Sequence, residues 1–167
     1  MGELVLDNPS WQAIYDPKTD RILGRLKKDT DLFTGIKEIC QQFGVSAGQF
    51  QCMGSLQYAT FRQVIKGKEE GTITYSPKIH STSEVELLSG TGFFGIDAIT
   101  RELEVHFHGI FIDCYQQING GHFLEHENKT AITIEYIIFP VYDALVSRQI
   151  DEKFKVPFFQ FKEKRDN

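Results

Sequence analysis

Three histidines in the second half of the chain have the residue type and the spacing of a metal site. They occur in Glu104-Val105-His106-Phe107-His108 and in Gly120-Gly121-His122. Alternate side chains of a β-strand point to the same face, so a strand through the first segment places His106 and His108 side by side. Imidazole nitrogens suit zinc, copper, nickel or iron, whereas calcium and magnesium prefer oxygen ligands. The residue types therefore indicate a transition-metal centre.

A hairpin brings the third histidine to the other two. If strands at Glu102–Asp113 and Asn119–Leu124 pair antiparallel around a turn near Cys114–Tyr115, residues whose numbers sum to about 230 lie opposite each other. This register sets His108 opposite His122, with His106 one diagonal step away. Three histidines without an evident fourth ligand predict an open, zinc-type site completed by water or a ligand. Gly120 and Gly121 are expected to let backbone or ligand approach closely.

Two acidic residues are candidates for chemistry beside the histidines. Glu104 shares the face of His106 by strand parity, and Glu125 follows His122 closely. Either carboxylate is a candidate general base or a partner of a metal ligand, although acids in such positions are more often ordinary surface residues. Two histidines in an HxH pair also occur without any metal. His80 and His126 lie in polar surroundings and are expected to be bystanders.

The elements that must position these residues are mostly strands. One amphipathic helix is predicted after the possible N-caps Asp29-Thr30-Asp31, with an apolar stripe from Leu32 to Phe43 and Gly44 as its C′ residue. An α+β fold follows, a single domain with a mainly antiparallel sheet and one long early helix. The expected strands are 21–26, 49–53, 55–64 with a kink at Gly54, 72–75, 83–89, 102–113, 121–124 and 130–139.

The two ends of the chain carry weaker patterns. Residues 1–19 contain turn signals and are expected to lie as an arm on the surface of the domain, which then spans residues 20–162. Within that span, Tyr142–Gln149 is predicted as a short helix and Phe154–Phe161 as an extended C-terminal segment. Residues 163–167 are expected to be a polar tail.

Composition limits the partners. The 167-residue chain has a net charge of −5 and a pI near 5.5, whereas domains that bind nucleic acid through a basic footprint usually have a pI above about 9. The densest basic cluster, Arg21, Arg25, Lys27 and Lys28, is interpreted as a solvated edge. No apolar run approaches the roughly 18 residues that a membrane helix needs. Three unpaired cysteines (Cys40, Cys52 and Cys114) and the lack of a signal peptide predict a cytoplasmic protein with reduced thiols.

The histidine motif resembles the signature of a known family. His106-Phe107-His108-Gly109-Ile110-Phe111-Ile112-Asp113, followed by Gly120-Gly121-His122-Phe123-Leu124, resembles the HxHxxLxD…GGHL signature of the PPC domain, which plants and prokaryotes share. The segments 44–48, 53–59 and 84–90 also match, so the resemblance runs from about Arg21 to Phe139. The family's DxxG turn appears here as Asp113-Cys114-Tyr115-Gln116, which favours a wider turn. Glu125 stands where small residues are common.

The resemblance implies a homotrimer whose three histidines bind a metal, usually zinc, and a regulatory role with DNA as a partner. The AT-hook that plant members use for DNA is missing from this sequence, and the acidic balance further disfavours DNA. The alternative is a metal-dependent enzyme or a small-molecule sensor built on the same site, in which zinc activates water. In a third reading the metal is structural and stabilises a hairpin or a subunit boundary. The sequence alone does not choose among them.

Overall fold

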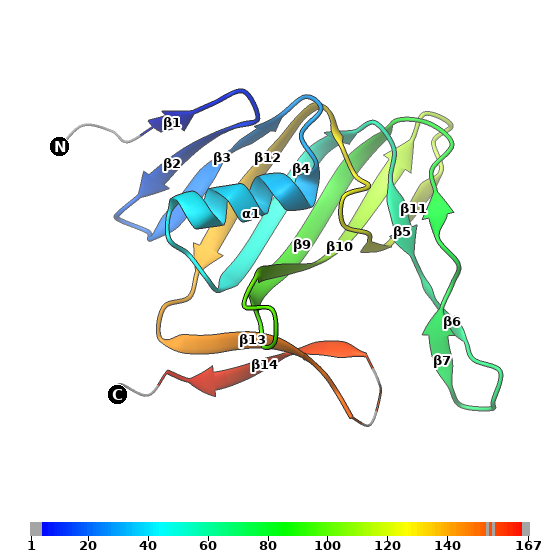
Figure 1. The fold of residues 1–167 in the computed structure, drawn as a ribbon. Coiled ribbons are helices and arrows are strands. Elements are labelled where there is room, and N and C mark those ends of the chain that lie inside the picture. The colour runs from blue at the N-terminus through cyan, green and yellow to red at the C-terminus, as the bar shows by residue number, and fades with distance from the viewer. Residues whose placement is uncertain (1–4, 153, 155, 165–167) are drawn as a thin grey trace.

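The histidine-bearing segments belong to one large, strongly curved sheet (Figure 1). In the computed structural model, residues 5–152, 154 and 156–164 are described. The hydrogen-bonded strand order is β1-β2-β3-β12-β4-β9-β10-β11-β5-β8, and a C-terminal hairpin, β13–β14, joins the sheet through β9. The strands are β1 (Val5–Asp7), β2 (Trp11–Asp16), β3 (Arg21–Lys27), β4 (Gly48–Leu56), β5 (Thr60–Arg62), β6 (Val64–Lys66), β7 (Ile73–Tyr75), β8 (Ile79–His80), β9 (Val85–Asp97), β10 (Leu103–Asp113), β11 (Ile118–Phe123), β12 (Thr130–Pro140), β13 (Ala144–Ile150) and β14 (Pro157–Glu163).

Pairing within this sheet is antiparallel apart from the short parallel contact between β13 and β9. The β6–β7 ribbon pairs only with itself and extends away from the sheet (Figure 1). The predicted α+β fold, with a mainly antiparallel sheet and one helix, is therefore confirmed.

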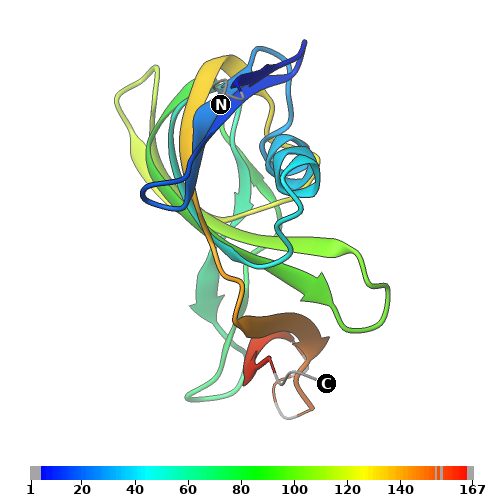
Figure 2. The same ribbon diagram turned by 90° about the vertical axis from the view of Figure 1, so that its left-hand side faces the viewer.

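Helix α1 (Leu32–Gln42) covers one face of the sheet (Figure 2). Of the three possible caps, Asp31 is the N-cap, and its Oδ1 accepts hydrogen bonds from the amides of Phe33 and Thr34 at 3.1 and 3.0 Å. At the other end Gly44 adopts φ +66°, and its amide and that of Val45 donate to the carbonyls of Gln41 and Cys40. This is a Schellman C-cap, which suits a residue without a Cβ.

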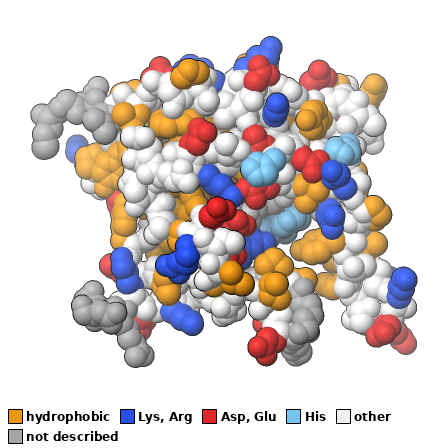
Figure 3. Space-filling view, in the orientation of Figure 1, with side chains coloured by type: hydrophobic (Ala, Val, Ile, Leu, Met, Phe, Trp, Pro, Cys, Tyr) orange, Lys and Arg blue, Asp and Glu red, His pale blue; other side chains and the backbone are white. Residues whose placement is uncertain are grey.

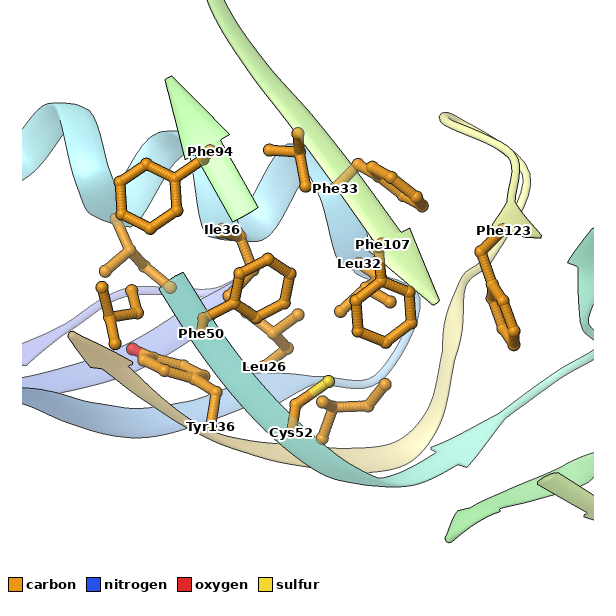
Figure 4. Packing of buried hydrophobic residues seen from close by; sticks show 14 of the residues in the cluster. Leu26, Leu32, Phe33, Ile36, Phe50, Cys52, Phe94, Phe107, Phe123 and Tyr136 are labelled. Carbon is orange, nitrogen blue, oxygen red and sulfur yellow. The ribbon is translucent and has the colours of Figure 1, made fainter. Parts of the chain in front are cut away.

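The core lies between α1 and the sheet, and aromatic rings dominate it (Figure 4). Phe107 of β10 stacks on Phe50 with ring centroids 5.4 Å apart and meets Phe33 and Phe123 edge to face. The ring of Phe107 lies over Gly90 of β9, where any Cβ would collide with it. Small residues on one strand therefore make room for large rings from its neighbours.

Two expectations about the chain ends are wrong. The N-terminal residues expected to lie on the surface form β1 and β2 from Val5 onward, and Trp11 and Ala13 are buried in the core. Tyr142–Gln149 is not helical, because residues 144–150 form β13 between β9 and β14 and Val146 packs against Gly95. The extended segment 154–161 corresponds to β14, which begins at Pro157 and runs to Glu163. Part of the predicted polar tail, residues 165–167, lies outside the described residues.

We expect Asp31→Ala to lower the free energy of unfolding by about 1 kcal/mol, the usual cost of a lost N-cap. Asp31→Asn keeps an acceptor oxygen for the helix amides, so its loss should be smaller. Urea denaturation followed by circular dichroism measures both variants. Equal losses in the two would show that the cap bonds are not what stabilises this helix start.

Candidate metal centre

The three predicted histidines meet on the face of the sheet that is turned away from the aromatic core. In β10 the odd-numbered residues Leu103, Val105 and Phe107 are buried, so the even-numbered His106 and His108 point to the opposite face. His108 pairs with His122 of β11, and the observed register sums to 230 as the sequence predicted. His106 and His122 are half-buried and His108 is exposed.

The ring nitrogens of the three side chains are close enough to share one ion. The Nε2 atom of His108 lies 3.1 Å from Nε2 of His106 and 3.3 Å from Nδ1 of His122, and all three donor atoms lie within 4.8 Å of one another. Two nitrogens bound to a tetrahedral zinc by bonds of about 2.05 Å are separated by about 3.3 Å. The donor set and its spacing therefore fit a transition-metal ion, with one coordination position left for another ligand.

The turn that sets this register is as tight as the predicted hairpin requires. The amide of Gln116 donates to the carbonyl of Asp113, and the amide of Asp113 donates to the carbonyl of Gln117. Gln116 adopts φ +63°, the left-handed conformation that glycine takes without strain. The turn keeps its length because Gln116 takes up that conformation itself, and the expectation of a wider hairpin is wrong.

Gly120 and Gly121 are sites of close backbone approach. A Cβ on Gly120 would collide with the carbonyl oxygen of Gly109 on β10, and one on Gly121 would collide with that of Arg62 on β5. These glycines let β11 lie tightly between its two neighbours, which holds His122 in place. Among the described residues, it is the backbone of the neighbouring strands that comes close to these two glycines. Close approach of a ligand here stays a prediction.

The two candidate carboxylates converge on a residue that sequence reasoning missed. Lys37 of α1 forms ion pairs with Glu125 and, at 3.8 Å, with Glu104. Lys37 can reach Glu104 because β11 pairs with β10 only from His108 onward. The first half of β10 therefore has no neighbouring strand on that side. Burial raises the pKa of Glu104, while Lys37 opposes the rise. Both acids thus belong to a half-buried ion-pair cluster around one ammonium group.

Asn128 is a second residue without a signal in the sequence. Its buried side chain accepts a hydrogen bond from the amide of Thr60 at 2.8 Å and donates to the carbonyls of Thr60 and Leu124 at 3.2 and 2.6 Å. Its own amide donates to Oδ2 of the helix cap Asp31. Asn128 thereby connects β5, the end of β11 and the start of α1, which fixes the strand that carries His122.

The remaining candidates lie elsewhere. His80 contacts Thr60, with 2.9 Å between Nδ1 and Oγ1, and His126 is an exposed residue with φ +62°, so neither belongs to the group of three. Cys40 and Cys52 are buried, and burial raises the pKa of Cys40 to about 12, which makes it a poor nucleophile. Cys114 is an exposed free thiol.

Electrostatics keep the imidazoles neutral, as metal binding requires. Burial, followed by the neighbouring charges of the other histidines and of Arg148, lowers the pKa of His106 to about 4. The pKa of His122 is also lowered to about 4, first by burial and then by the charges of His108, Arg148 and Arg62. Burial also lowers the pKa of the more exposed His108. Near neutral pH the lone pairs of the group are therefore available.

In metal-free protein we expect the free energy of unfolding to fall as the pH drops from about 6.5 towards about 4. Unfolded histidines gain protons near pH 6.5, whereas folded His106 and His122 stay neutral until about pH 4. The unfolded state therefore binds more protons in this window, and acid favours unfolding. Urea denaturation of EDTA-treated protein across the window measures the slope.

The double variant His106→Gln/His122→Gln should show a shallower dependence on pH than the wild type. His126→Gln, which removes an exposed histidine, should leave the slope unchanged. A double variant with the wild-type slope would contradict the assignment of lowered pKa values to this pair.

Comparison with known proteins places this geometry in context. A protein described as a plant- and prokaryote-conserved (PPC) protein, from Pyrococcus horikoshii, is 18% identical with a TM-score of 0.70, over 93% of this chain and 97% of that one. A metal-containing protein from Archaeoglobus fulgidus is 19% identical with a TM-score of 0.68, over 84% and 92% of the two chains. A Bacteroides thetaiotaomicron chain called a "putative DNA binding protein" is 14% identical with a TM-score of 0.70, over 89% and 97%. At these identities the likeness shows the fold.

The family itself is shown by the sequence. No curated protein matches the chain, but a family model matches residues 15–141, from the end of β2 through β12 and across all three histidines. The chain therefore belongs to the Plants and Prokaryotes Conserved (PCC) domain family, the family that the histidine signature indicated.

Proposed function

We propose that this protein is a homotrimeric regulatory protein that binds a transition metal, zinc or a relative, through His106, His108 and His122. The observation that carries the proposal is the spacing of the donor nitrogens: Nε2 of His108 lies 3.1 and 3.3 Å from those of His106 and His122, as in a tetrahedral ion, and all three lie within 4.8 Å of one another. The naming of the Archaeoglobus neighbour as metal-containing supports it. An ion held by three imidazoles supplies Lewis acidity to whatever occupies its open position.

The surrounding residues favour ligand sensing over catalysis. Glu104 and Glu125 are the acids nearest in sequence to the histidines, and Lys37 pairs with both, so neither is a free general base. Their charges are partly neutralised, which leaves the face beside the histidines polar without a poised proton acceptor. An enzyme remains the alternative function, and a ligand-binding centre needs only the groups that are present.

An exposed apolar surface supports the trimer. Met53, Leu88 and Ile137 line a shallow groove on the uncovered face of β4, β9 and β12, and Met53 and Leu88 are 52% and 44% exposed. Exposed apolar patches of this kind commonly mark interfaces between subunits. The unpaired cysteines support a reducing compartment, so we place the protein in the cytoplasm. In the described part of the chain no helix is long and apolar enough to span a membrane.

Metal content of untagged protein tests the proposal. Elemental mass spectrometry is expected to find close to one transition-metal ion per chain in the wild type and at least a tenfold loss in His108→Ala. His126→Gln is the matched control and should retain its metal. Absence of metal from the wild type, even after supplementation with zinc, would overturn the proposal.

Light scattering on the same samples separates an open site from a structural one. We expect three times the chain mass of 19.2 kDa in the wild type and in His108→Ala alike. Dissociation or unfolding of His108→Ala would show that the metal acts structurally. A monomeric wild type would remove the trimer from the proposal.

DNA is the second candidate, and the Bacteroides neighbour's name favours it. In the basic cluster, Lys27 contacts Asp7 and the guanidinium of Arg21 lies over the ring of Phe139, while Arg25 and Lys28 are exposed. Two exposed cations predict weak binding that disappears as salt rises. Fluorescence anisotropy with a labelled duplex at low salt should detect binding that Arg25→Gln/Lys28→Gln abolishes. No binding to any duplex at low salt would exclude DNA.

A further inference from the structure

Two arginines share the face of the sheet that carries the histidines. Arg62, the last residue of β5, pairs directly with His122, and paired residues point to the same side of a sheet. On the other side Arg148 of β13 pairs with Asp97 of β9, and Gly95, two residues before Asp97, pairs with Glu104. Strand alternation therefore places Arg148 on the face of Glu104 and His106.

The strand order puts these cations on opposite sides of the histidines. The sequence of neighbours is β13-β9-β10-β11-β5, so each arginine stands two strands from β10, which carries His106 and His108. In the space-filling view, basic and acidic side chains are interspersed over the face that is drawn (Figure 3).

Within the described residues neither arginine forms a close ion pair, although the charge of Arg148 acts on Asp97 and Glu104 and works to lower the pKa of both. Among the residues that the structure describes, neither guanidinium has a carboxylate oxygen within 4 Å. Arg148 lies over the ring of Phe159, 5.3 Å from its centroid, which steadies its side chain without neutralising it.

The acids of this face are already engaged. Asp97 accepts hydrogen bonds from the amides of Ile99 and Thr100 at 2.8 and 2.7 Å. Glu104 and Glu125 are paired with Lys37. These three acids balance the charges of Lys37, Arg62 and Arg148, so an ion of charge +2 bound by the histidines gives the site a net positive charge, which attracts a negatively charged ligand.

We infer that the ligand of this centre is a small oxyanion, a phosphate or carboxylate group, held between Arg62 and Arg148 at the open position of the metal. This inference rests on the proposed metal site and names the chemical class that the site accepts. Guanidinium groups present planar forks of N–H donors that match the oxygens of carboxylate and phosphate. A neutral acceptor would gain weaker hydrogen bonds from the two arginines than an anion would, and a cation would be repelled by them.

The test uses full-length protein loaded with cobalt, whose visible absorption reports on the ligands around the ion. Inorganic phosphate and acetate are titrated into the wild type, Arg62→Gln and Arg148→Gln. Imidazole, a neutral donor, is titrated in parallel. Lys18→Gln is the matched control, since it removes one exposed positive charge from the turn between β2 and β3, away from the histidines.

We expect the dissociation constant for phosphate, acetate or both to rise at least fivefold in Arg62→Gln and in Arg148→Gln and less than twofold in Lys18→Gln. The dissociation constant for imidazole should stay within twofold in all variants. Binding by phosphate alone or acetate alone distinguishes the two oxyanion classes, and either result supports the inference.

Two outcomes separate this inference from the function on which it rests. If cobalt binds with a normal spectrum but the anions do not bind, or bind both arginine variants as well as they bind the wild type, the inference is overturned and the proposed metal site is retained. A wild-type protein that shows no cobalt spectrum would overturn both.

Discussion

The structure depends on the burial of Phe107 between two histidines. Its ring fills the space over Gly90 and contacts Phe33, Phe50 and Phe123, so this side chain cannot turn outward without leaving a large cavity in the core. Because side chains alternate along a strand, the same burial directs His106 and His108 to the other face. Core packing therefore sets the orientation of the candidate ligands, and an interior that stabilises the fold also preorganises the site.

The third ligand depends on contacts that are less local. His122 lies on the short strand β11, which is held by glycines that let β10 and β5 come close and by Asn128 beyond its end. The backbone amide of Asn128 donates a hydrogen bond to Asp31, the N-cap of α1, which holds Asn128 in place. One helix start, one buried amide and one hairpin are thus coupled, so the geometry of the site is a property of the assembled domain.

The sequence predicted what short-range rules decide. Alternation along β10 and a tight hairpin gave the pairing of His108 with His122, and the helix followed from its cap, apolar stripe and C′ glycine. Residues that approach from distant segments had no such signal: Lys37 comes from the helix and Arg148 from the C-terminal hairpin. The helix expected at 142–149 was wrong for the same reason, since the strand that pairs with β13 begins only at Pro157. Gln116 could replace a glycine because one residue with φ +63° is a modest strain.

The net charge of the chain does not predict the electrostatics at the histidines, because it sums charged groups that are too far from the site to act on it. The chain carries −5 overall, yet the acids nearest the histidines are held by Lys37 or by backbone amides, and the two flanking guanidinium groups are not paired with them. Screening at physiological salt limits the reach of exposed charges to about 8 Å, so distant acids on the outer strands contribute little here. The charge that a ligand meets at the three histidines is therefore set by the few groups around them and by the ion that we propose there, and the net charge of the chain does not predict its sign.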